Sequence, residues 1–340
     1  MAKRLGKDTI EFSQKPRVCL WASIVGKKEG EGPLSAGFDR IVKDDLLGEK
    51  TWELAESRMF QQSVEACLAK GNLKPDDVNI LIGGDLINQI MATHFAAREL
   101  DIPLLGLYGA CSTIAEAFTV GAAFVDGGGT IRVVCASSSH FCSAERQYRS
   151  PLEMGGQRNL SAQWTVTGAG AFLICDTLHA AKPTAHITHS TIGRVTDYGI
   201  NDATNMGAVM APAAARTLAQ HLTDTNRTVS DYDMILTGDL GAIGHELFIE
   251  LLRERGIYMP DNLTKDCGMM IYSGDQHVHS GGSGAGCASA VLASTIFPMF
   301  ERREVNRVAF IATGALLSAS STFQGETIPA VAHLVVFERV

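Results

Sequence analysis

The sequence lacks the features that would place it across a membrane or mark it for secretion. Its apolar runs, such as residues 131–136, are strand-length and far shorter than the roughly 18–20 residues that span a bilayer. The basic residues near the N-terminus are followed by no apolar stretch, so we expect no secretory signal peptide. Any contact with a membrane is therefore expected to be peripheral.

Basic tracts and paired cysteines are also missing. The 29 basic and 37 acidic residues give a formal net charge of −8 without a cluster that could neutralise phosphates, so we expect no nucleic-acid partner. The eight cysteines show no CxxC spacing, and several lie in apolar runs, which favours buried free thiols in a reducing compartment. Aromatic residues make up only 7% of the chain while glycine occurs 34 times, a balance typical of alternating strands and helices.

What the sequence does contain is an internal repeat. Residues 79–86 (NILIGGDL) and 234–240 (MILTGDL) are apolar runs that end in Gly-Asp-Leu, 154 residues apart. A helical pattern follows each of them, and two further pairs of strand-like runs come in the same order in both halves. This common order predicts a duplicated α/β fold. The expected helices are 51–70, 92–100, 208–222 and 245–255, and the expected later strands are 131–137, 168–175, 306–313 and 328–337.

The repeat also predicts the domain organisation. We expect an N-terminal half over residues 1–180 and a C-terminal half over 181–340, because the residues near 176–186 are polar and turn-forming. Residues 141–167 are polar, interrupted by Gly and Pro, and without a clear period. They predict an irregular segment that either caps a cleft or forms an oligomer interface.

One cysteine stands in a chemically suggestive place. The stretch 106–117, GLYGACSTIAEA, puts Cys111 between a glycine-containing turn and an alanine-rich helical pattern. The free N–H groups and the dipole at a helix start favour a thiolate there. Taken alone, the motif fits a nucleophile, and it equally fits a cysteine that packs at a helix start.

In its wider context the chain resembles the thiolase-fold condensing enzymes. The duplicated halves, the position of Cys111 and the glycine-rich stretch HVHSGGSGAGCAS (277–289) carry that resemblance over nearly the whole chain. It implies an α/β thiolase-like fold with two βαβαβ-type halves in a five-layered α/β/α/β/α arrangement. The closer resemblance is to the stage V sporulation protein AD family of spore-forming bacteria. It rests on GLYGACSTIAEA, SSSHFCSAERQYR (137–149), QWTVTGAGA (163–171), GRVTDYGINDATNMGAVMAPAA (193–214) and TGALLSASSTFQGETIPAVAHLV (313–335).

The resemblance bears on catalysis. A condensing enzyme uses a Cys nucleophile with two partners, His with His or Asn. Cys111 matches the nucleophile, but the first partner position falls at Gly238 or Asp239 and the second at Ser283; His279 is near enough that a shifted alignment would restore one histidine. The expectation is a non-catalytic protein. The alternative is an active ketoacyl synthase III-like acyltransferase that uses Cys111, and a third hypothesis is an assembly scaffold with a vestigial pocket.

The sporulation family implies a ligand and partners. It is associated with dipicolinic acid (pyridine-2,6-dicarboxylate), the dianion that spores accumulate with calcium. The resemblance therefore implies a dipicolinate-binding protein of the spore membrane transport assembly, needed for uptake into the developing spore and, as a further expectation, for release on germination. It would lie peripherally on the spore inner membrane with other stage V sporulation A membrane proteins. Thiolase-fold proteins also imply a homodimer. No cofactor is expected, and any calcium would be carried with the ligand.

The expected site combines two helix starts. The N–H groups near Cys111 and those of the glycines beside Ser283 could donate to carboxylates without a buried cation. The glycines resemble half of a dinucleotide fingerprint but stand too late in the chain for one, so they predict close backbone approach to a ligand. The expected ligand-binding residues are Asp85, Cys111, Ser112, Thr113, His140, Gly282, Ser283 and Gly284.

Several of these residues have two interpretations. Asp85 would repel a dianion unless it were protonated, bridged by water or in contact with calcium; otherwise it caps the following helix, as Asp239 could do in the repeat. His140 either pairs with a ligand carboxylate or is a core histidine. His277 and His279 on an extended segment would share one face, but with no evident third ligand we expect no metal site. Arginines in the irregular segment either steer an anion or lie at the surface or an interface: Arg146, Arg149 and Arg158.

Overall fold

The computed structural model describes residues 2–148, 158–180 and 183–340. Its main sheet has the strand order β12-β11-β14-β15-β10-β3-β9-β7-β5-β6, which is two five-stranded halves joined edge to edge. The first half contains β3 (Arg17–Val25), β5 (Ile80–Gly84), β6 (Leu104–Gly106), β7 (Arg132–Ser139) and β9 (Gly168–Cys175). The second contains β10 (Ala185–Thr191), β11 (Met234–Thr237), β12 (Thr264–Asp266), β14 (Arg307–Ala315) and β15 (Ala330–Arg339).

The two halves repeat one pairing pattern. In the first, β5 pairs parallel with β6 and β7, and β9 pairs antiparallel with β7 and β3. In the second, β11 pairs parallel with β12 and β14, and β15 pairs antiparallel with β14 and β10. The same order and the same strand directions confirm the duplicated α/β fold.

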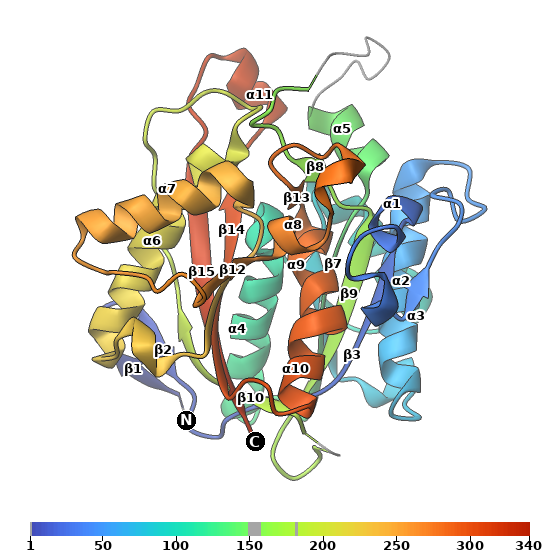
Figure 1. Ribbon diagram of the computed structural model, residues 1–340. Coiled ribbons are helices and arrows are strands. Elements are labelled where there is room, and N and C mark those ends of the chain that lie inside the picture. Colours follow the sequence, from blue (N-terminus) through green and yellow to red (C-terminus); the bar gives the residue numbers. More distant parts are fainter. Residues whose placement is uncertain (1, 149–157, 181–182) are drawn as a thin grey trace.

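The helices complete five layers (Figure 1). The central layer is α4 (Thr113–Asp126) with α9 (Ala285–Val291); α4 contacts strands of both halves. On the outer face of the first half lie α2 (Trp52–Ala69) and α3 (Met91–Leu100), and on that of the second lie α6 (Met206–Thr225) and α7 (Gly241–Glu254). The central layer is apolar on both faces because it is buried between two sheets, as the alanine-rich sequence of α4 requires.

The seam between the halves is short. β10 and β3 share only the pairs Ala185–Val18 and His186–Arg17. Beyond them, the N-terminal hairpin of β1 (Lys3–Leu5) and β2 (Thr9–Glu11) pairs with the other end of β10. An N-terminal segment therefore adds to the sheet of the second half, whereas the division at residue 180 remains a prediction.

The segment expected to be irregular over 141–167 needs correction. It begins with the helix α5 (Phe141–Tyr148), which buries Ser143, Ala144 and Glu145. It later contains β8 (Trp164–Thr165), which pairs parallel with β13 (Gly282–Ser283). Polar side chains fill the buried face of α5, so the segment shows no apolar period in the sequence.

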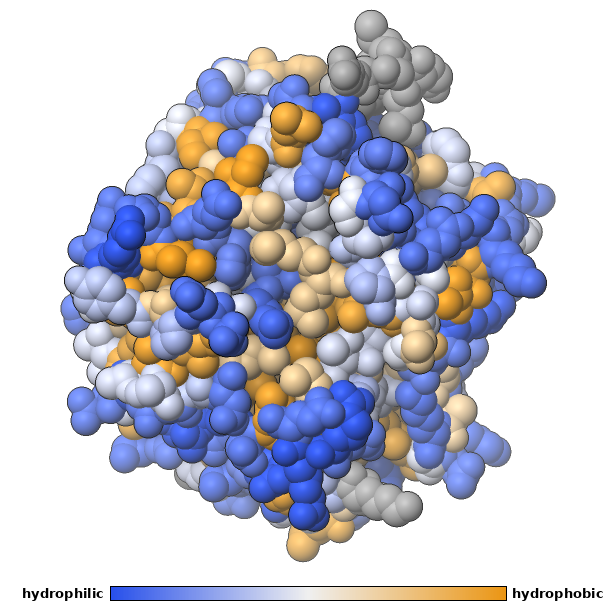
Figure 2. Space-filling view, in the orientation of Figure 1, coloured by the Kyte–Doolittle hydropathy of each residue, from blue (hydrophilic) through white to orange (hydrophobic). Residues whose placement is uncertain are grey.

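Further short elements are α1 (Lys27–Gly30), β4 (Arg40–Ile41), α8 (Cys267–Met270), α10 (Phe297–Glu301) and α11 (Ala319–Phe323). Within the described ranges, no helix is long and apolar enough to cross a bilayer. Figure 2 shows one face of the molecule, where polar residues predominate and apolar side chains are scattered among them.

Candidate functional site

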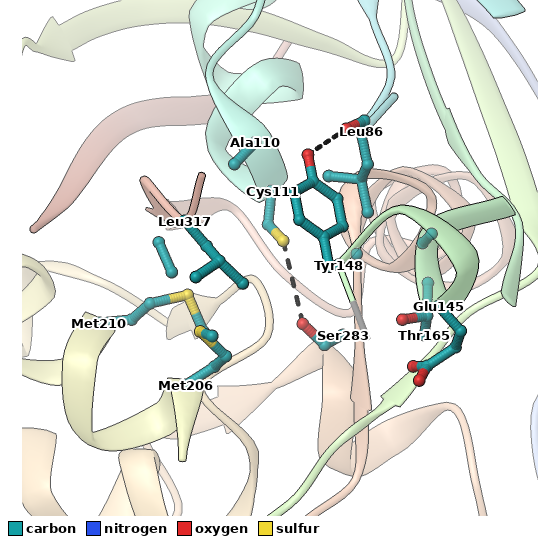
Figure 3. A pocket seen from close by; sticks show the side chains of 13 residues that line it. Leu86, Ala110, Cys111, Glu145, Tyr148, Thr165, Met206, Met210, Ser283 and Leu317 are labelled. Atoms are coloured by element: carbon teal, nitrogen blue, oxygen red, sulfur yellow. Dashed lines mark hydrogen bonds between the residues drawn. The ribbon is translucent and has the colours of Figure 1, made fainter. Parts of the chain in front are cut away.

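A pocket opens where the parallel strands of both halves end. It holds about 570 Å³ of empty space, counted out to its open mouth. Most of the lining is apolar, with a few hydroxyls, one thiol and one carboxylate (Figure 3). The lining residues are Leu86, Ala110, Cys111, Ala144, Glu145, Tyr148, Thr165, Met206, Met210, Ser283, Gly284, Ala315 and Leu317.

Cys111 lies at the turn that begins α4. Ala110 directly before it has a φ of 54°, a left-handed conformation that a non-glycine residue adopts at a cost. The Cys111 Sγ points toward Ser283, with 3.9 Å between Sγ and Oγ (Figure 3). The strained turn thus aims the thiol across the junction between the two halves.

Asp239 stands behind that pair and holds it together. Its Oδ2 accepts hydrogen bonds from the Ser283 hydroxyl at 2.8 Å and the Gly284 N–H at 3.0 Å, and its Oδ1 accepts one from the Thr313 hydroxyl at 3.0 Å. The side chain is almost fully buried. The residues around the thiol are therefore an acid and a hydroxyl, in the positions where the resemblance to condensing enzymes would place two bases or amides.

The electrostatics of this group oppose a thiolate. Burial, followed by the nearby charge of Asp239, raises the pKa of Cys111 well above its usual value. Burial also raises the pKa of Asp239 to about 6, although hydrogen bonds with Cys111, Gly284 and Ser283 favour the carboxylate. Because a thiol acts as a nucleophile through its thiolate, Cys111 is held in its unreactive form at neutral pH.

Asp85 lies in the equivalent position of the first half but makes different contacts. Its Oδ1 accepts from the Ile87 N–H at 2.8 Å, and its Oδ2 accepts from the Thr93 N–H at 2.8 Å and the Thr93 hydroxyl at 2.7 Å. Thr93 lies in the first turn of α3, so Asp85 caps that helix. The Asp85 side chain is fully buried and is not among the residues that line the pocket.

The capping role in the second half belongs to another residue. Asp266 accepts from the Leu240 N–H at 2.8 Å and the Gly241 N–H at 3.1 Å, where α7 begins. The Asp239 carboxylate is therefore available to bond to Ser283 and Gly284 at the pocket. The interpretation of Asp239 as a cap for α7 is wrong, although its sequence context matches that of Asp85.

The other residues expected at the helix starts divide into two groups. Ser283 and Gly284 line the pocket, but the Gly284 N–H already donates to Asp239. Ser112 and Thr113 are fully buried, and their hydroxyls donate to the carbonyls of Gly109 and Ala110 at 2.7 Å each. Gly282 lies in β13 behind the lining.

The histidines lie away from the pocket lining. His140 is buried; its Nε2 lies 2.9 Å from the Asp45 carbonyl, its Nδ1 accepts from the Cys142 N–H at 3.2 Å, and burial lowers its pKa. His277 and His279 have φ values of 54° and 57°, so the extended segment expected to align their rings does not exist. Among the described residues no three potential ligands gather into a metal site.

The described arginines of the 141–167 segment make different contacts. Arg158 lies 3.4 Å from the buried Glu145 and over the ring of Trp164. Arg146 pairs with Glu53 at the surface. Arg149 lies outside the described residues.

Several lining residues were missed by sequence reasoning. Met206 and Met210 lie in residues 193–214, which supported the family resemblance but predicted no pocket wall. Tyr148 and Glu145 lie in the segment that was expected to be irregular. The spacing of four residues between the two methionines, at the start of a helix, was the available signal. Nothing local in the sequence indicated which side of α5 faces a pocket.

Comparison with known proteins gives matches over nearly the whole chain. Residues 6–338 match the family model for stage V sporulation protein AD. The chain is 45% identical over 337 residues to stage V sporulation protein AD of Bacillus subtilis (strain 168), covering 99% of this chain and 98% of that one.

Solved structures show the fold. 3-Oxoacyl-[acyl-carrier-protein] synthase III from Aquifex aeolicus is similar with a TM-score of 0.57 and 13% identity, over 95% of this chain and 99% of that one. Human mitochondrial 3-ketoacyl-CoA thiolase in complex with CoA gives a TM-score of 0.62 and 12% identity, over 97% and 99%. At such identities the likeness shows a thiolase-type fold alone.

Proposed function

Because this chain belongs to the stage V sporulation protein AD family, we propose that its pocket binds dipicolinate and performs no acyl chemistry. The protein would serve the spore's dipicolinate transport assembly, in uptake into the developing spore and in release on germination. It would lie peripherally on the spore inner membrane beside other stage V sporulation A membrane proteins.

The observation that carries this proposal is the Cys111–Ser283–Asp239 group. Condensation needs a thiolate and donors that stabilise a developing negative charge. Asp239 instead presents negative charge and raises the pKa of the Cys111 thiol, and its Oδ2 occupies the Ser283 hydroxyl and the Gly284 N–H. The group supports binding better than catalysis.

The rest of the lining fits a flat aromatic ligand. Met206, Met210 and Leu317 supply polarisable and aliphatic surface on one side of the pocket, opposite Tyr148 (Figure 3). Thioether groups pack favourably against aromatic rings. The hydroxyl of Thr165 also lines the pocket and can donate to a ligand carboxylate.

The charge of the pocket favours a particular form of the ligand. Glu145 lines the pocket 3.4 Å from Arg158, and Asp239 lies directly behind the lining residue Ser283, so two carboxylates lie close to the space that a dianion would enter. Their repulsion is removed if a calcium ion arrives with the ligand, because carboxylate oxygens are ligands that calcium prefers. We therefore propose the calcium chelate as the preferred ligand.

Calorimetric titration tests the proposal. Purified protein is titrated with dipicolinate in the presence and absence of calcium, beside Cys111→Ala and Ser283→Ala variants. We expect saturable binding that is stronger with calcium and weaker in Ser283→Ala. An acyl-CoA control, followed by mass spectrometry of the Cys111 peptide, should give no adduct; an acylated Cys111 with no dipicolinate binding would instead support the acyltransferase alternative.

A homodimer is proposed on the same family basis. The edge strand β6 pairs only with β5 among the described residues, and Leu105 on it is 37% exposed. A second copy could pair along this edge. Sedimentation equilibrium should then give twice the chain mass, and Leu105→Pro should give the monomer mass.

A further inference from the structure

A second cavity adjoins the pocket and has a different chemistry. It holds about 990 Å³ of empty space and shares four wall residues with the pocket: Ala110, Tyr148, Ala315 and Leu317. Its other side chains include neutral hydrogen-bonding groups, namely Asn88, Tyr108, Gln147, Ser318 and Ser320. Among its described lining residues none carries a formal charge, in contrast to the pocket with Glu145. We call this second cavity the vestibule.

Tyr148 forms part of the partition between the two spaces. It is the last residue of α5, and its hydroxyl donates a hydrogen bond to the carbonyl of Leu86 across the pocket wall (Figure 3). The same hydroxyl lies 3.5 Å from that of Tyr108 in the vestibule. Burial raises the pKa of Tyr148, so it remains a neutral donor at physiological pH.

The bond to Leu86 can be released for about the net free energy of one ordinary hydrogen bond, without the larger cost of an unsatisfied buried group. The Leu86 carbonyl also accepts from Gln147 Nε2 at 3.1 Å, so it keeps one donor when Tyr148 turns away. The released hydroxyl has the Tyr108 hydroxyl as an alternative partner within reach. Because neither group is left buried without a partner, the penalty for an unmade hydrogen bond does not apply.

The loop that carries Leu86 is tied to α5 by a further contact. Asn88 donates its N–H to Gln147 Oε1 at 2.8 Å, which ties the loop after β5 to α5. Gln89 and Ile90 in this loop have φ values of 54° and 49°. This left-handed conformation is strained, most of all for Ile90, which is β-branched. The loop that carries the Leu86 carbonyl is thus tied to α5, whereas the Tyr148 hydroxyl has two partners within reach, Leu86 and Tyr108.

We propose that the vestibule is a waiting site for the same planar dicarboxylate, and that Tyr148 is the latch past which the ligand moves between the vestibule and the pocket. This inference rests on the proposed function. Neutral hydroxyls and amides donate to carboxylates without the long-range attraction of a cation, so they hold the ligand weakly and exchange it quickly. The pocket, which has the carboxylate of Glu145 and apolar walls, then retains one form of the ligand, the calcium chelate.

Stopped-flow mixing of full-length protein with calcium dipicolinate tests this order of events. Trp164, next to the lining residue Thr165, provides the fluorescence signal, and the absorbance of the pyridine ring is recorded in parallel. We expect an observed rate that rises and then saturates with ligand concentration, because passage past Tyr148 limits it. Tyr148→Phe should raise the plateau rate and the dissociation rate together by about fivefold, the factor that one ordinary hydrogen bond represents.

A vestibule variant separates the waiting step from the latch. The double substitution Ser318→Ala and Ser320→Ala, at exposed positions, should raise the ligand concentration at half-saturation several-fold while the plateau rate remains that of the native chain. Ser230→Ala, at an exposed serine outside both cavities, is the matched control and should leave every parameter unchanged. Thermal unfolding of each variant checks that it is folded.

The outcomes distinguish the latch from the proposed function. A rate that stays linear in ligand concentration and is the same in Tyr148→Phe, together with saturable calorimetric binding, would overturn the latch and leave the proposed function standing. Absence of saturable binding to the native chain in calorimetry would overturn both.

Discussion

At the scale of single residues, Asp239 decides the chemistry of Cys111. Replacing it with Asn removes the nearby negative charge, so the pKa of Cys111 should fall and the thiol should react at lower pH. We expect alkylation of Cys111 by iodoacetamide to remain slow in the native chain well above pH 8, and to reach its half-maximal rate at a clearly lower pH in Asp239→Asn. Peptide mass spectrometry measures the labelling across a pH series.

The matched control for that experiment is Asp261→Asn, a substitution of an exposed aspartate outside the pocket lining. It should leave the labelling profile of Cys111 unchanged. A native Cys111 that already labels fully at pH 7 would contradict the argument, because it would mean that the thiol is not protected by burial and by Asp239.

Glu29 offers a second test at this scale. Its side chain is buried, Oε1 accepts from the Tyr272 hydroxyl and from the Thr167 N–H at 3.0 Å, and burial raises its pKa to about 7. The folded state therefore favours the protonated acid, and ionisation costs stability progressively as the pH rises from about 4.5 to 7. Glu29→Gln removes this cost, so it should be more stable than the native chain by about 3 kcal/mol at pH 8 and by much less at pH 5.

Denaturant unfolding of both proteins at the two pH values measures that difference. Gln keeps the acceptor oxygen for Tyr272 and Thr167, but its NH2 group takes the place of Oε2, which is buried without a hydrogen-bond partner, so the change in the difference between pH 5 and pH 8 reports the ionisation. An advantage of the same size at pH 5 and pH 8 would show that packing, and not ionisation, separates the two proteins.

The limits of sequence reasoning are clearest at the two aspartates. Asp85 and Asp239 share the motif Gly-Asp-Leu, yet one caps a helix and the other accepts hydrogen bonds from the pocket-lining residues Ser283 and Gly284. The difference comes from Asp266, which is 27 residues further along than Asp239 and takes over the helix start. The resemblance placed a catalytic partner position at Gly238 or Asp239, where the sequence has no histidine, but no local pattern could show what the Asp239 carboxylate contacts.

At the scale of elements, α6 and α7 pack through two glycines. A Cβ at Gly244 would lie 2.7 Å from the Gly207 Cα, so the helices can approach this closely only without side chains there. Gly244→Ala should destabilise the protein by about 1–3 kcal/mol through overpacking. It should also weaken dipicolinate binding, because α6 carries Met206 and Met210 into the pocket wall.

Gly274→Ala is the control for this contact, since a Cβ at that position meets nothing within 4 Å and its φ is not in the left-handed region. Chemical denaturation gives the stability of each variant and calorimetry gives its affinity. If Gly244→Ala were as stable as Gly274→Ala, the close approach of the two helices would not be a constraint on the fold.

The element that sequence reasoning missed is α5. Its inner face is held by polar contacts, among them the bond from the Ser143 hydroxyl to Glu56 Oε2 at 2.6 Å. Glu56 belongs to α2, 87 residues away, and burial raises its pKa well above the usual value. A helix stabilised by such distant partners leaves no apolar period to detect.

At the scale of the whole molecule, the duplication was predictable because each half repeats the same order of apolar runs. The resulting thiolase-type fold matches the solved structures. The seam was not predictable, because the pairing of β2 with β10 joins residues about 180 positions apart and depends on how the halves meet. This seam is also where the second half holds its buried histidines.

Low pH should therefore destabilise the second half near these histidines more than the first half. Burial lowers the pKa values of His186 and His189 on β10 to about 4, and that of His221 on α6 to about 3. The unfolded chain protonates its histidines near pH 6.5, so stability from these groups is present above that pH and is lost as the pH falls toward 4. Over the same range, Glu29, Asp85 and Asp239 take up protons in the folded state, which offsets part of the loss elsewhere.

Hydrogen exchange as a function of pH tests this. Between pH 7 and pH 4.5 we expect protection factors to fall first in β10, β2 and the adjoining part of α6, while β5 and β7 keep theirs. His186 faces Glu338, Lys15 and Arg17 at the seam, and His186→Gln should reduce the loss of protection there; His279→Gln, at an exposed position outside the seam strands, should have no effect. Equal loss of protection in both halves would mean that the seam does not limit the acid stability, and that the molecule unfolds as a single unit.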